Sequence, residues 1–203
     1  MKSKIILAGG YMSKAPDGGT EFCKEVIKDI NQPVKILECL FALEPESWEK
    51  ALEKDKQMFL KALPNTAIQF EIAEKNNFVS QIHNADVIYF RGGNAQQLVE
   101  ELREITDWQE ALHEKIVIGT SAGAYVLSEF YIHAAELPEL RRGFGLVPTK
   151  TVAHYMSNYL HKNDLAKSRG FWKKIDNLLD SSESHLGSTK LAEGEYKIFR
   201  KSS

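Results

Sequence analysis

The chain alternates short apolar runs with longer segments that have the hydrophobic spacing of amphipathic helices. Runs of three to six apolar residues are typical of strands buried on both faces of a sheet. The expected strands are 5–8, 34–40, 67–72, 86–90 and 116–118. The expected helices are 20–30, 45–63, 78–83, a helix that includes Leu98 and Leu102, 108–113 and 122–130. This alternation predicts α/β architecture: a mostly parallel sheet covered by helices on both faces, in three layers.

Beyond Phe130 the hydrophobic pattern is looser. Short strands are expected at 146–147 and 151–153, followed by a helix over 165–179. The segments 190–192 and 195–199 are expected to form a terminal hairpin. Because the chain contains no repeat, linker or low-complexity tract, residues 1–203 are expected to form a single domain.

The charge balance excludes several classes of partner. Among the 203 residues, 26 Lys and Arg face 28 Asp and Glu, so the formal net charge is −2. No basic field is present to bind nucleic acid or an anionic membrane. The apolar run Ile5–Ala8 is too short for a signal-peptide core, and no stretch approaches the roughly 20 apolar residues of a membrane span. We therefore expect a cytoplasmic protein. Its two cysteines indicate neither a disulfide framework nor a zinc site.

The segment Gly119-Thr120-Ser121-Ala122-Gly123 matches the pattern G-x-S-x-G. It follows a predicted strand and precedes a predicted helix, which is the context of a nucleophile elbow. Small flanking residues allow a sharp turn that raises the serine hydroxyl above the sheet edge, beside unpaired N–H groups of the helix. Ser121 is therefore the candidate nucleophile. The alternative is a glycine-rich turn in which Ser121 only caps the helix.

A second glycine-rich turn, Arg91-Gly92-Gly93-Asn94, ends the strand 86–90. In a parallel sheet it reaches the same edge as Ser121, where ligands gather. The backbone N–H groups of the two glycines could approach a substrate carbonyl, with the Ala122 N–H as a second donor. The alternative is a plain turn with Asn94 as the helix N-cap, and the two interpretations are compatible.

A serine nucleophile needs a base, and His154 is the favoured histidine. It follows residues 151–153, so it lies at the exit of a predicted strand, on the candidate active edge. His133 and His161 are the alternatives, whereas His83 and His113 are expected on helix surfaces. Spacing alone leaves four candidates for the third, acidic member: Glu129, Glu136, Asp164 and Glu193.

The order of several motifs resembles the dipeptidase E (aspartyl dipeptidase) family. The motifs are Gly-Gly-Asn at 92–94, Thr-Ser-Ala-Gly-Ala at 120–124, Gly-Leu-Val-Pro at 145–148, His-Tyr at 154–155 and Ala-Glu-Gly at 192–194. The resemblance spans roughly residues 4–195 and implies a class I glutamine amidotransferase-like (flavodoxin-like) fold. It further implies a serine peptidase that needs no metal or organic cofactor.

The resemblance also implies roles for individual residues. Ser121 would be the nucleophile, His154 the general base, and Gly92 or Gly93 with Ala122 the oxyanion donors. The acid would be Glu193, which matches the family's Leu-Pro-Glu-Gly segment, with Glu136 as the alternative.

The resemblance also bears on substrate preference. Arg169 lies near the position of a substrate-facing Arg that would bind an N-terminal Asp side chain, and Arg141 and Arg142 are rivals. Arg91 replaces the family's small residue before Gly-Gly-Asn, and Ala95 replaces a Thr, so the pocket could differ. The expected activity is hydrolysis of small peptides, by a monomer or homodimer. The alternatives are an esterase or amidase, or a noncatalytic binding protein.

Overall fold

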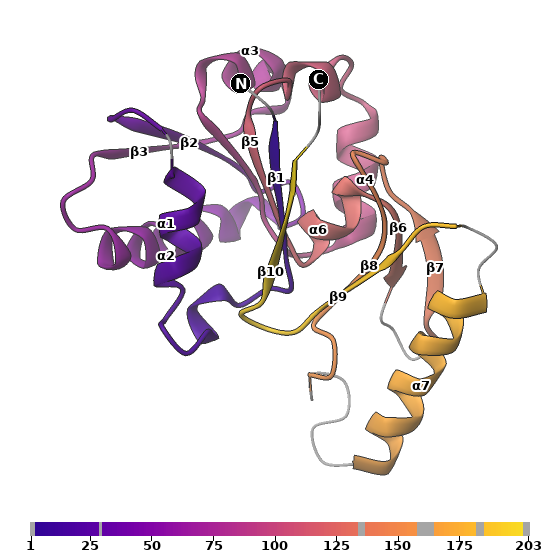
Figure 1. Ribbon diagram of the computed structural model, residues 1–203. Helices are drawn as coiled ribbons and strands as arrows, with labels where there is room; N and C mark the ends of the chain where they lie inside the picture. The colour runs from indigo at the N-terminus through magenta and orange to yellow at the C-terminus, as the bar shows by residue number, and fades with distance from the viewer. Residues whose placement is uncertain (1–2, 29, 134–136, 158–164, 182–184, 201–203) are drawn as a thin grey trace.

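The computed structural model describes residues 3–28, 30–133, 137–157, 165–181 and 185–200. Two sheets carry most of its secondary structure (Figure 1). The last strand runs beside the first, with Lys4 paired to Arg200.

The larger sheet has six strands in the order β10-β1-β5-β4-β2-β3. Their bounds are Tyr196–Arg200 (β10), Lys4–Ala8 (β1), Ile116–Thr120 (β5), Val87–Phe90 (β4), Val34–Cys39 (β2) and Ile68–Ile72 (β3). Five strands are parallel and only β10 is antiparallel, paired with β1. The carboxyl ends of β1, β5 and β4 therefore lie side by side, which places the loops that follow them at one edge.

Helices cover both faces of this sheet, as the alternating pattern predicts. Alternate strand residues such as Ile6, Ile36 and Ile118 pack against α1 (Thr20–Ile27) and α2 (Trp48–Ala62). Residues of the opposite parity, such as Leu7 and Leu37, pack against the other helices. Those are α3 (Phe78–Asn84), α4 (Ala95–Arg103), α5 (Trp108–Ala111) and α6 (Ala122–Leu127). Short 3₁₀ turns η1 (Met12–Lys14), η2 (Pro45–Ser47) and η3 (Lys75–Asn77) connect the elements. The expected three-layer α/β fold is confirmed.

A second sheet of four strands, in the order β7-β6-β8-β9, lies beside α6 (Figure 1). Its strands are Glu139–Arg142 (β7), Ser128–His133 (β6), Val147–Ala153 (β8) and Ser188–Leu191 (β9). The helix α7 (Leu165–Ser181) packs on it through a separate apolar cluster that includes Phe171, Trp172 and Ile175.

Two expectations for this part of the chain are wrong. The helix after Ser121 ends at Leu127 instead of continuing to Phe130, and residues 128–133 form β6. At the junction, the Ser128 hydroxyl lies 2.7 Å from the Ala124 carbonyl oxygen and 2.7 Å from Thr151 Oγ1. The expected terminal hairpin is absent as well, because β9 pairs with β8 whereas β10 pairs with β1.

Candidate active site

Ser121 occupies the turn between β5 and α6, with φ 52° and ψ −111°. This conformation is strained for a residue with a side chain and is typical of a nucleophile elbow. The Ser121 N–H donates to the Ala8 carbonyl at 2.9 Å. A Cβ on Gly123 would lie 1.9 Å from the Phe90 carbonyl oxygen, and one on Gly119 would lie 2.5 Å from Gly123. The close packing of strand and helix therefore requires both glycines of the motif.

His154 lies directly after β8, and its Nε2 is 2.9 Å from Ser121 Oγ. Its backbone has φ 54°, and its N–H donates to the Gly9 carbonyl at 3.1 Å. Gly10 makes room for the imidazole: with φ 98°, it has no side chain where a Cβ would lie 2.6 Å from His154 Cε1. The loop after β1 therefore both holds the backbone of His154 and accommodates its ring.

Glu193 lies in the turn between β9 and β10, on the far side of the imidazole from Ser121. Its Oε1 is 3.4 Å from His154 Nδ1, and its Oε2 is 2.6 Å from Lys14 Nζ. The structure thus brings the three residues Ser121, His154 and Glu193 together in the order that a triad requires. The alternative acid, Glu136, lies outside the described residues.

The environment of His154 favours a neutral imidazole. Burial lowers the pKa of His154, the nearby Glu193 carboxylate acts in the opposite direction, and the Lys14 ammonium lowers that pKa further. The side chain is 21% exposed, so the ring is largely shielded from water. A neutral ring whose Nε2 faces a hydroxyl can accept its proton, which is the requirement for a general base.

The other ionisable candidates that the structure describes have different neighbours. His133 lies on β6, and Glu129 on the same strand forms an ion pair with Arg142 at 2.9 Å. His161 and Asp164 lie outside the described residues.

Gly92 and Ala122 lie on either side of the nucleophile. A Cβ on Gly92 would lie 2.9 Å from Ser121 Cβ and 3.4 Å from its Oγ, so only glycine allows this approach. Ala122 is the first residue of α6, where helical N–H groups have no partner within the helix. Gly93 instead packs against Ala42, whose carbonyl oxygen a Cβ would approach to 2.2 Å. The backbone that follows β4 and the first residue of α6 thus both lie beside Ser121.

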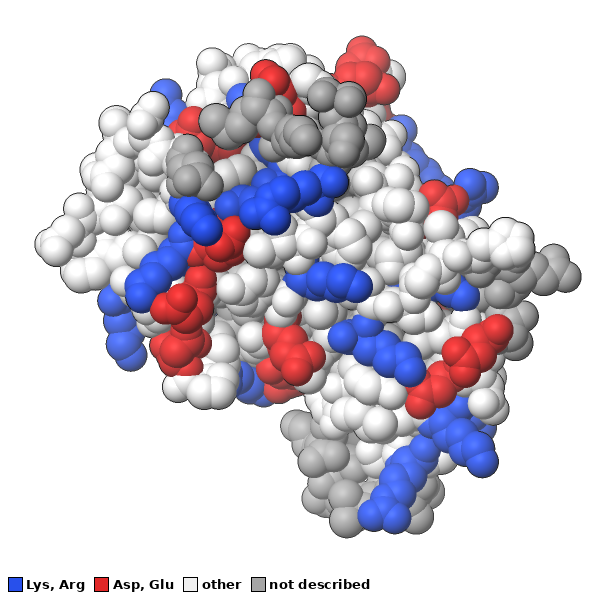
Figure 2. Space-filling view, in the orientation of Figure 1, with Lys and Arg blue, Asp and Glu red and all other residues white. Residues whose placement is uncertain are grey.

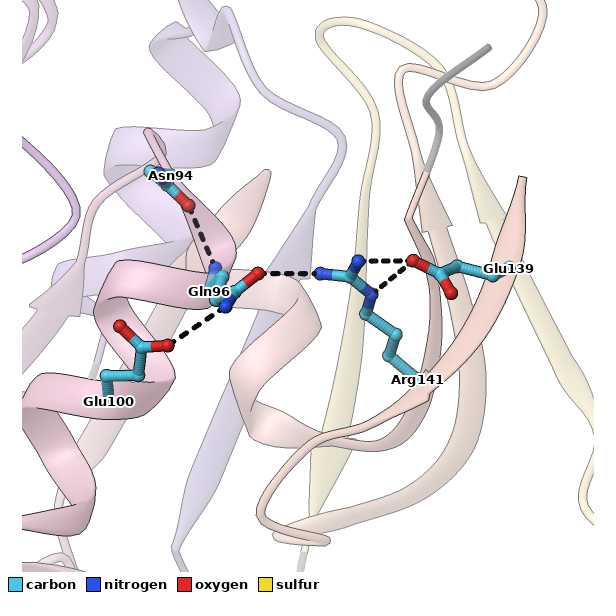
Figure 3. A network of polar contacts seen from close by, with 5 residues as sticks. All are labelled: Asn94, Gln96, Glu100, Glu139 and Arg141. Atoms are coloured by element: carbon cyan, nitrogen blue, oxygen red, sulfur yellow. Dashed lines mark hydrogen bonds and ion pairs between the residues drawn. The ribbon is translucent and has the colours of Figure 1, made fainter. Parts of the chain in front are cut away.

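Asn94 is the N-cap of α4, as one of its two interpretations anticipates. Its Oδ1 accepts hydrogen bonds from the N–H groups of Gln96 at 3.0 Å and Gln97 at 3.2 Å. Its own N–H donates to the Ala42 carbonyl at 2.8 Å. These bonds fix the start of α4 and, with it, the glycine turn that precedes the helix; Figure 3 shows the bond between Asn94 and Gln96.

The three candidate arginines lie in different settings. Arg169 is exposed on α7 and forms no hydrogen bond or ion pair with another described residue. Arg141 on β7 reaches the first turn of α4, where it donates to Gln96 Oε1 at 3.2 Å, and it is paired with Glu139 (Figure 3). Arg142, the third, is paired with Glu129.

A buried ionic cluster at the carboxyl ends of β2 and β4 escaped the sequence analysis. Arg91 forms an ion pair with Asp55 of α2. Next to them lies Glu38, a fully buried residue of β2 whose two carboxylate oxygens have no hydrogen-bond partner among the described residues. Burial and the neighbouring Asp55 raise the pKa of Glu38 well above its ordinary value. The signal was available: Glu38 is a single acid inside the apolar run 36–40.

Within the described parts of the chain, no group of three or more His, Cys, Asp or Glu side chains is placed to hold a metal ion. No described helix is long and apolar enough to cross a membrane.

A serine in a strained strand-to-helix turn, hydrogen-bonded to a histidine that lies beside a carboxylate, is the arrangement of serine-type hydrolases. Comparison with known proteins narrows this class. The sequence matches the family described as Peptidase family S51 over residues 41–188, more than half of the chain. The chain therefore belongs to peptidase family S51, the dipeptidase E family, and is a serine-type peptidase.

Two solved structures have the same fold. A candidate peptidase E protein from Listeria monocytogenes EGD-e superposes with a TM-score of 0.67 at 18% identity, covering 100% of this chain and 96% of the other. A peptidase from an acI-B1 Actinobacterium superposes with a TM-score of 0.56 at 23% identity, covering 84% of this chain and 75% of the other. A search of curated proteins returns no match.

Proposed function

We propose that the chain hydrolyses small peptides through a Ser121–His154–Glu193 triad. The observation that carries this proposal is the 2.9 Å contact between Ser121 Oγ and His154 Nε2, with the Glu193 carboxylate 3.4 Å behind the ring. These distances allow proton transfer from the hydroxyl to the imidazole, and they place a negative charge where the imidazolium forms.

The steps follow from the geometry. His154 takes the hydroxyl proton as Ser121 Oγ attacks the peptide carbonyl carbon. The N–H groups of Gly92 or Gly93 and of Ala122 stabilise the oxyanion. His154 then donates its proton to the leaving amine, and an acyl group remains on Ser121. A water molecule, deprotonated by His154, hydrolyses this ester and restores the hydroxyl.

For the substrate we propose short peptides, including dipeptides with an N-terminal Asp. Arg169 is the proposed partner of the aspartate side chain, because a guanidinium binds a carboxylate through two parallel hydrogen bonds. Its exposure leaves the guanidinium available to a ligand. Arg141 is engaged by Glu139 and Gln96, which disfavours it for this role.

We further propose a cytoplasmic monomer or homodimer that acts on peptides and not on nucleic acid. On the face shown in Figure 2, Lys and Arg side chains are interspersed with Asp and Glu. This mixture agrees with the net charge of −2 and offers no broad basic surface on that face to a polyanion. The pairing of β10 with β1 supports a single domain over 1–203, because it joins the two ends of the chain.

Labelling with a fluorophosphonate, followed by intact mass measurement and peptide mapping, tests the triad. We expect one adduct, on Ser121, and none on folded Ser121→Ala. His154→Ala should label at least about 10³-fold more slowly, because the residues of a triad act as a unit. If the folded wild-type protein does not react, the nucleophile assignment is wrong and a binding role becomes the better explanation. If Ser121 is labelled, the next step is a screen of Asp-X, Glu-X and neutral dipeptides, with simple esters as the comparison.

A further inference from the structure

We propose that Lys14 is a positioning residue, which holds the Glu193 carboxylate in place behind His154. This proposal rests on the proposed triad and goes beyond it, because it assigns a fourth side chain, which is hydrogen-bonded to the triad at Glu193. Lys14 is the last residue of η1, in the loop after β1, and is separated from Glu193 by almost the entire chain.

The two oxygens of the Glu193 carboxylate have different partners. Oε2 accepts a hydrogen bond from Lys14 Nζ at 2.6 Å, and Oε1 faces His154 Nδ1 at 3.4 Å. A charge-assisted bond to one oxygen fixes the plane of the carboxylate, so the other oxygen stays directed at the imidazole. Groups that act on a functional side chain from behind in this way commonly alter its affinity or activity.

Lys14 is itself held in position. The Lys14 ammonium lies 4.2 Å from the centre of the Tyr11 ring, a cation–π contact. The backbone N–H of Lys14 donates to the Tyr11 carbonyl at 2.8 Å. The edge of the same aromatic ring meets the His154 imidazole, with the ring centres 5.5 Å apart. Tyr11 thus contacts both the cation and the base, so the ammonium has a defined location although the Lys14 side chain is 56% exposed.

The backbone joins the two segments that supply these groups. The Gly194 N–H donates to the Gly10 carbonyl at 3.0 Å, and the Gly9 N–H donates to the Glu195 carbonyl at 2.9 Å. Gly194 has φ 80°, and a Cβ there would lie 2.8 Å from the Ala15 nitrogen. The turn that carries Glu193 is therefore packed directly on the loop that carries Lys14. This packing keeps the backbones of Lys14 and Glu193 close enough for their side chains to pair.

The ammonium also has an electrostatic effect on the base. Among the described residues, the groups that act on His154 include Ser121 from the elbow, Tyr11 and Lys14 from the loop after β1, and Glu193 from the turn before β10. The neighbouring Glu195 carboxylate instead accepts the Ala192 N–H at 2.9 Å. Lys14 offsets part of the Glu193 charge, so without it the imidazole would hold its proton up to a higher pH.

The rate of fluorophosphonate labelling as a function of pH tests this role without a known substrate. Lys14→Met removes the charge and keeps most of the side-chain volume. We expect labelling at pH 8 to slow about 10-fold, and the midpoint of its rise with pH to move up by about half a pH unit. Lys14→Arg should restore most of the rate, because a guanidinium can also bind the carboxylate.

Lys24→Met is the matched control, since Lys24 is also 56% exposed and forms an ion pair with Glu21 at 2.8 Å. The Lys14 proposal is overturned if Lys14→Met labels like Lys24→Met, or if its rate falls with no change in the pH midpoint. A wild-type protein that does not label at all would instead contradict the triad, so the two failures are distinguishable.

Discussion

Two ionic clusters flank the elbow, and they differ in exposure and in pairing. β5 lies between β1 and β4, and Ser121 follows it. At the β1 side, the Lys14 ammonium pairs with the Glu193 carboxylate, which faces the His154 imidazole, and Lys14 reaches solvent. At the β4 side, Arg91 and Asp55 are paired in a shielded place beside Glu38, with side chains 22% and 11% exposed.

The difference in exposure indicates different roles for the two clusters. In the proposed mechanism His154 exchanges protons with Ser121, the leaving amine and water, so partial exposure suits the β1-side cluster. The β4-side cluster directly precedes Gly92, the residue closest to the nucleophile in the neighbouring turn. A shielded ion pair is costly to break, and one at this position fixes the loop that offers backbone donors. The β1-side cluster is thus suited to proton transfer, and the β4-side cluster is suited to holding the loop at Gly92 in place.

Arg91→Ala tests whether the β4-side cluster stabilises the fold, and it has the largest expected effect. It leaves the Asp55 carboxylate shielded from water without its cation, and we expect a loss of about 3 kcal/mol in the free energy of unfolding. Urea denaturation measures this loss. Arg103→Ala, at an exposed position on α4, serves as the control and should cost less than about 0.5 kcal/mol. Equal effects of the two substitutions would show that the β4-side cluster does not stabilise the fold.

Gly92→Ala tests the turn that lies between the β4-side cluster and Ser121. The new Cβ would lie 2.9 Å from Ser121 Cβ and 3.1 Å from the Thr120 carbonyl oxygen, so the turn must move away from the nucleophile. We expect fluorophosphonate labelling of Ser121 to slow about 10²-fold, as after loss of one oxyanion donor. Gly170→Ala is the control, since a Cβ there meets no described atom within 4 Å. Unchanged labelling of Gly92→Ala would remove this turn from the proposed oxyanion site.

Glu38→Gln tests how the β4-side cluster makes the free energy of unfolding depend on pH. Because burial raises the pKa of Glu38 above its ordinary value of 4.5, the folded protein keeps this proton after the unfolded chain has lost it. The contribution of Glu38 to stability is therefore full below pH 4.5 and falls as the pH rises toward the folded-state pKa.

Glutamine cannot ionise and lacks this loss. Relative to the wild type, Glu38→Gln should thus gain stability steadily as the pH rises from 5 to 8, as measured by urea unfolding. A difference that is constant with pH would show that Glu38 is ionised in the folded protein, or that it is not shielded from water.

The sequence predicted those features that depend on local patterns. The strands of the larger sheet and the turn at Ser121 are encoded in contiguous residues, and they are close to their expected positions. His154 was found because it follows a strand, and the structure places it beside Ser121. The family resemblance supplied Glu193, which spacing alone did not select.

The remaining features depend on contacts between distant segments. Lys14 and Glu193 lie 179 positions apart, and no local pattern relates them. The helical spacing after Ser121 continues past Leu127, yet residues 128–133 pair with β8 and become a strand. Pairing with β1 likewise separates β10 from β9. In each case tertiary pairing overrides a local preference.

The place of Glu193 just before β10 has a consequence for biosynthesis. The carboxylate reaches His154 only when its turn is held against the loop after β1, and β10 provides this support by pairing with β1. If the proposed triad is correct, a ribosome that has released the elbow and the histidine has not yet released all that orients the base. In that case His154 acquires its full set of neighbours only after residues 196–200 emerge, so synthesis itself would delay the onset of activity in a new molecule.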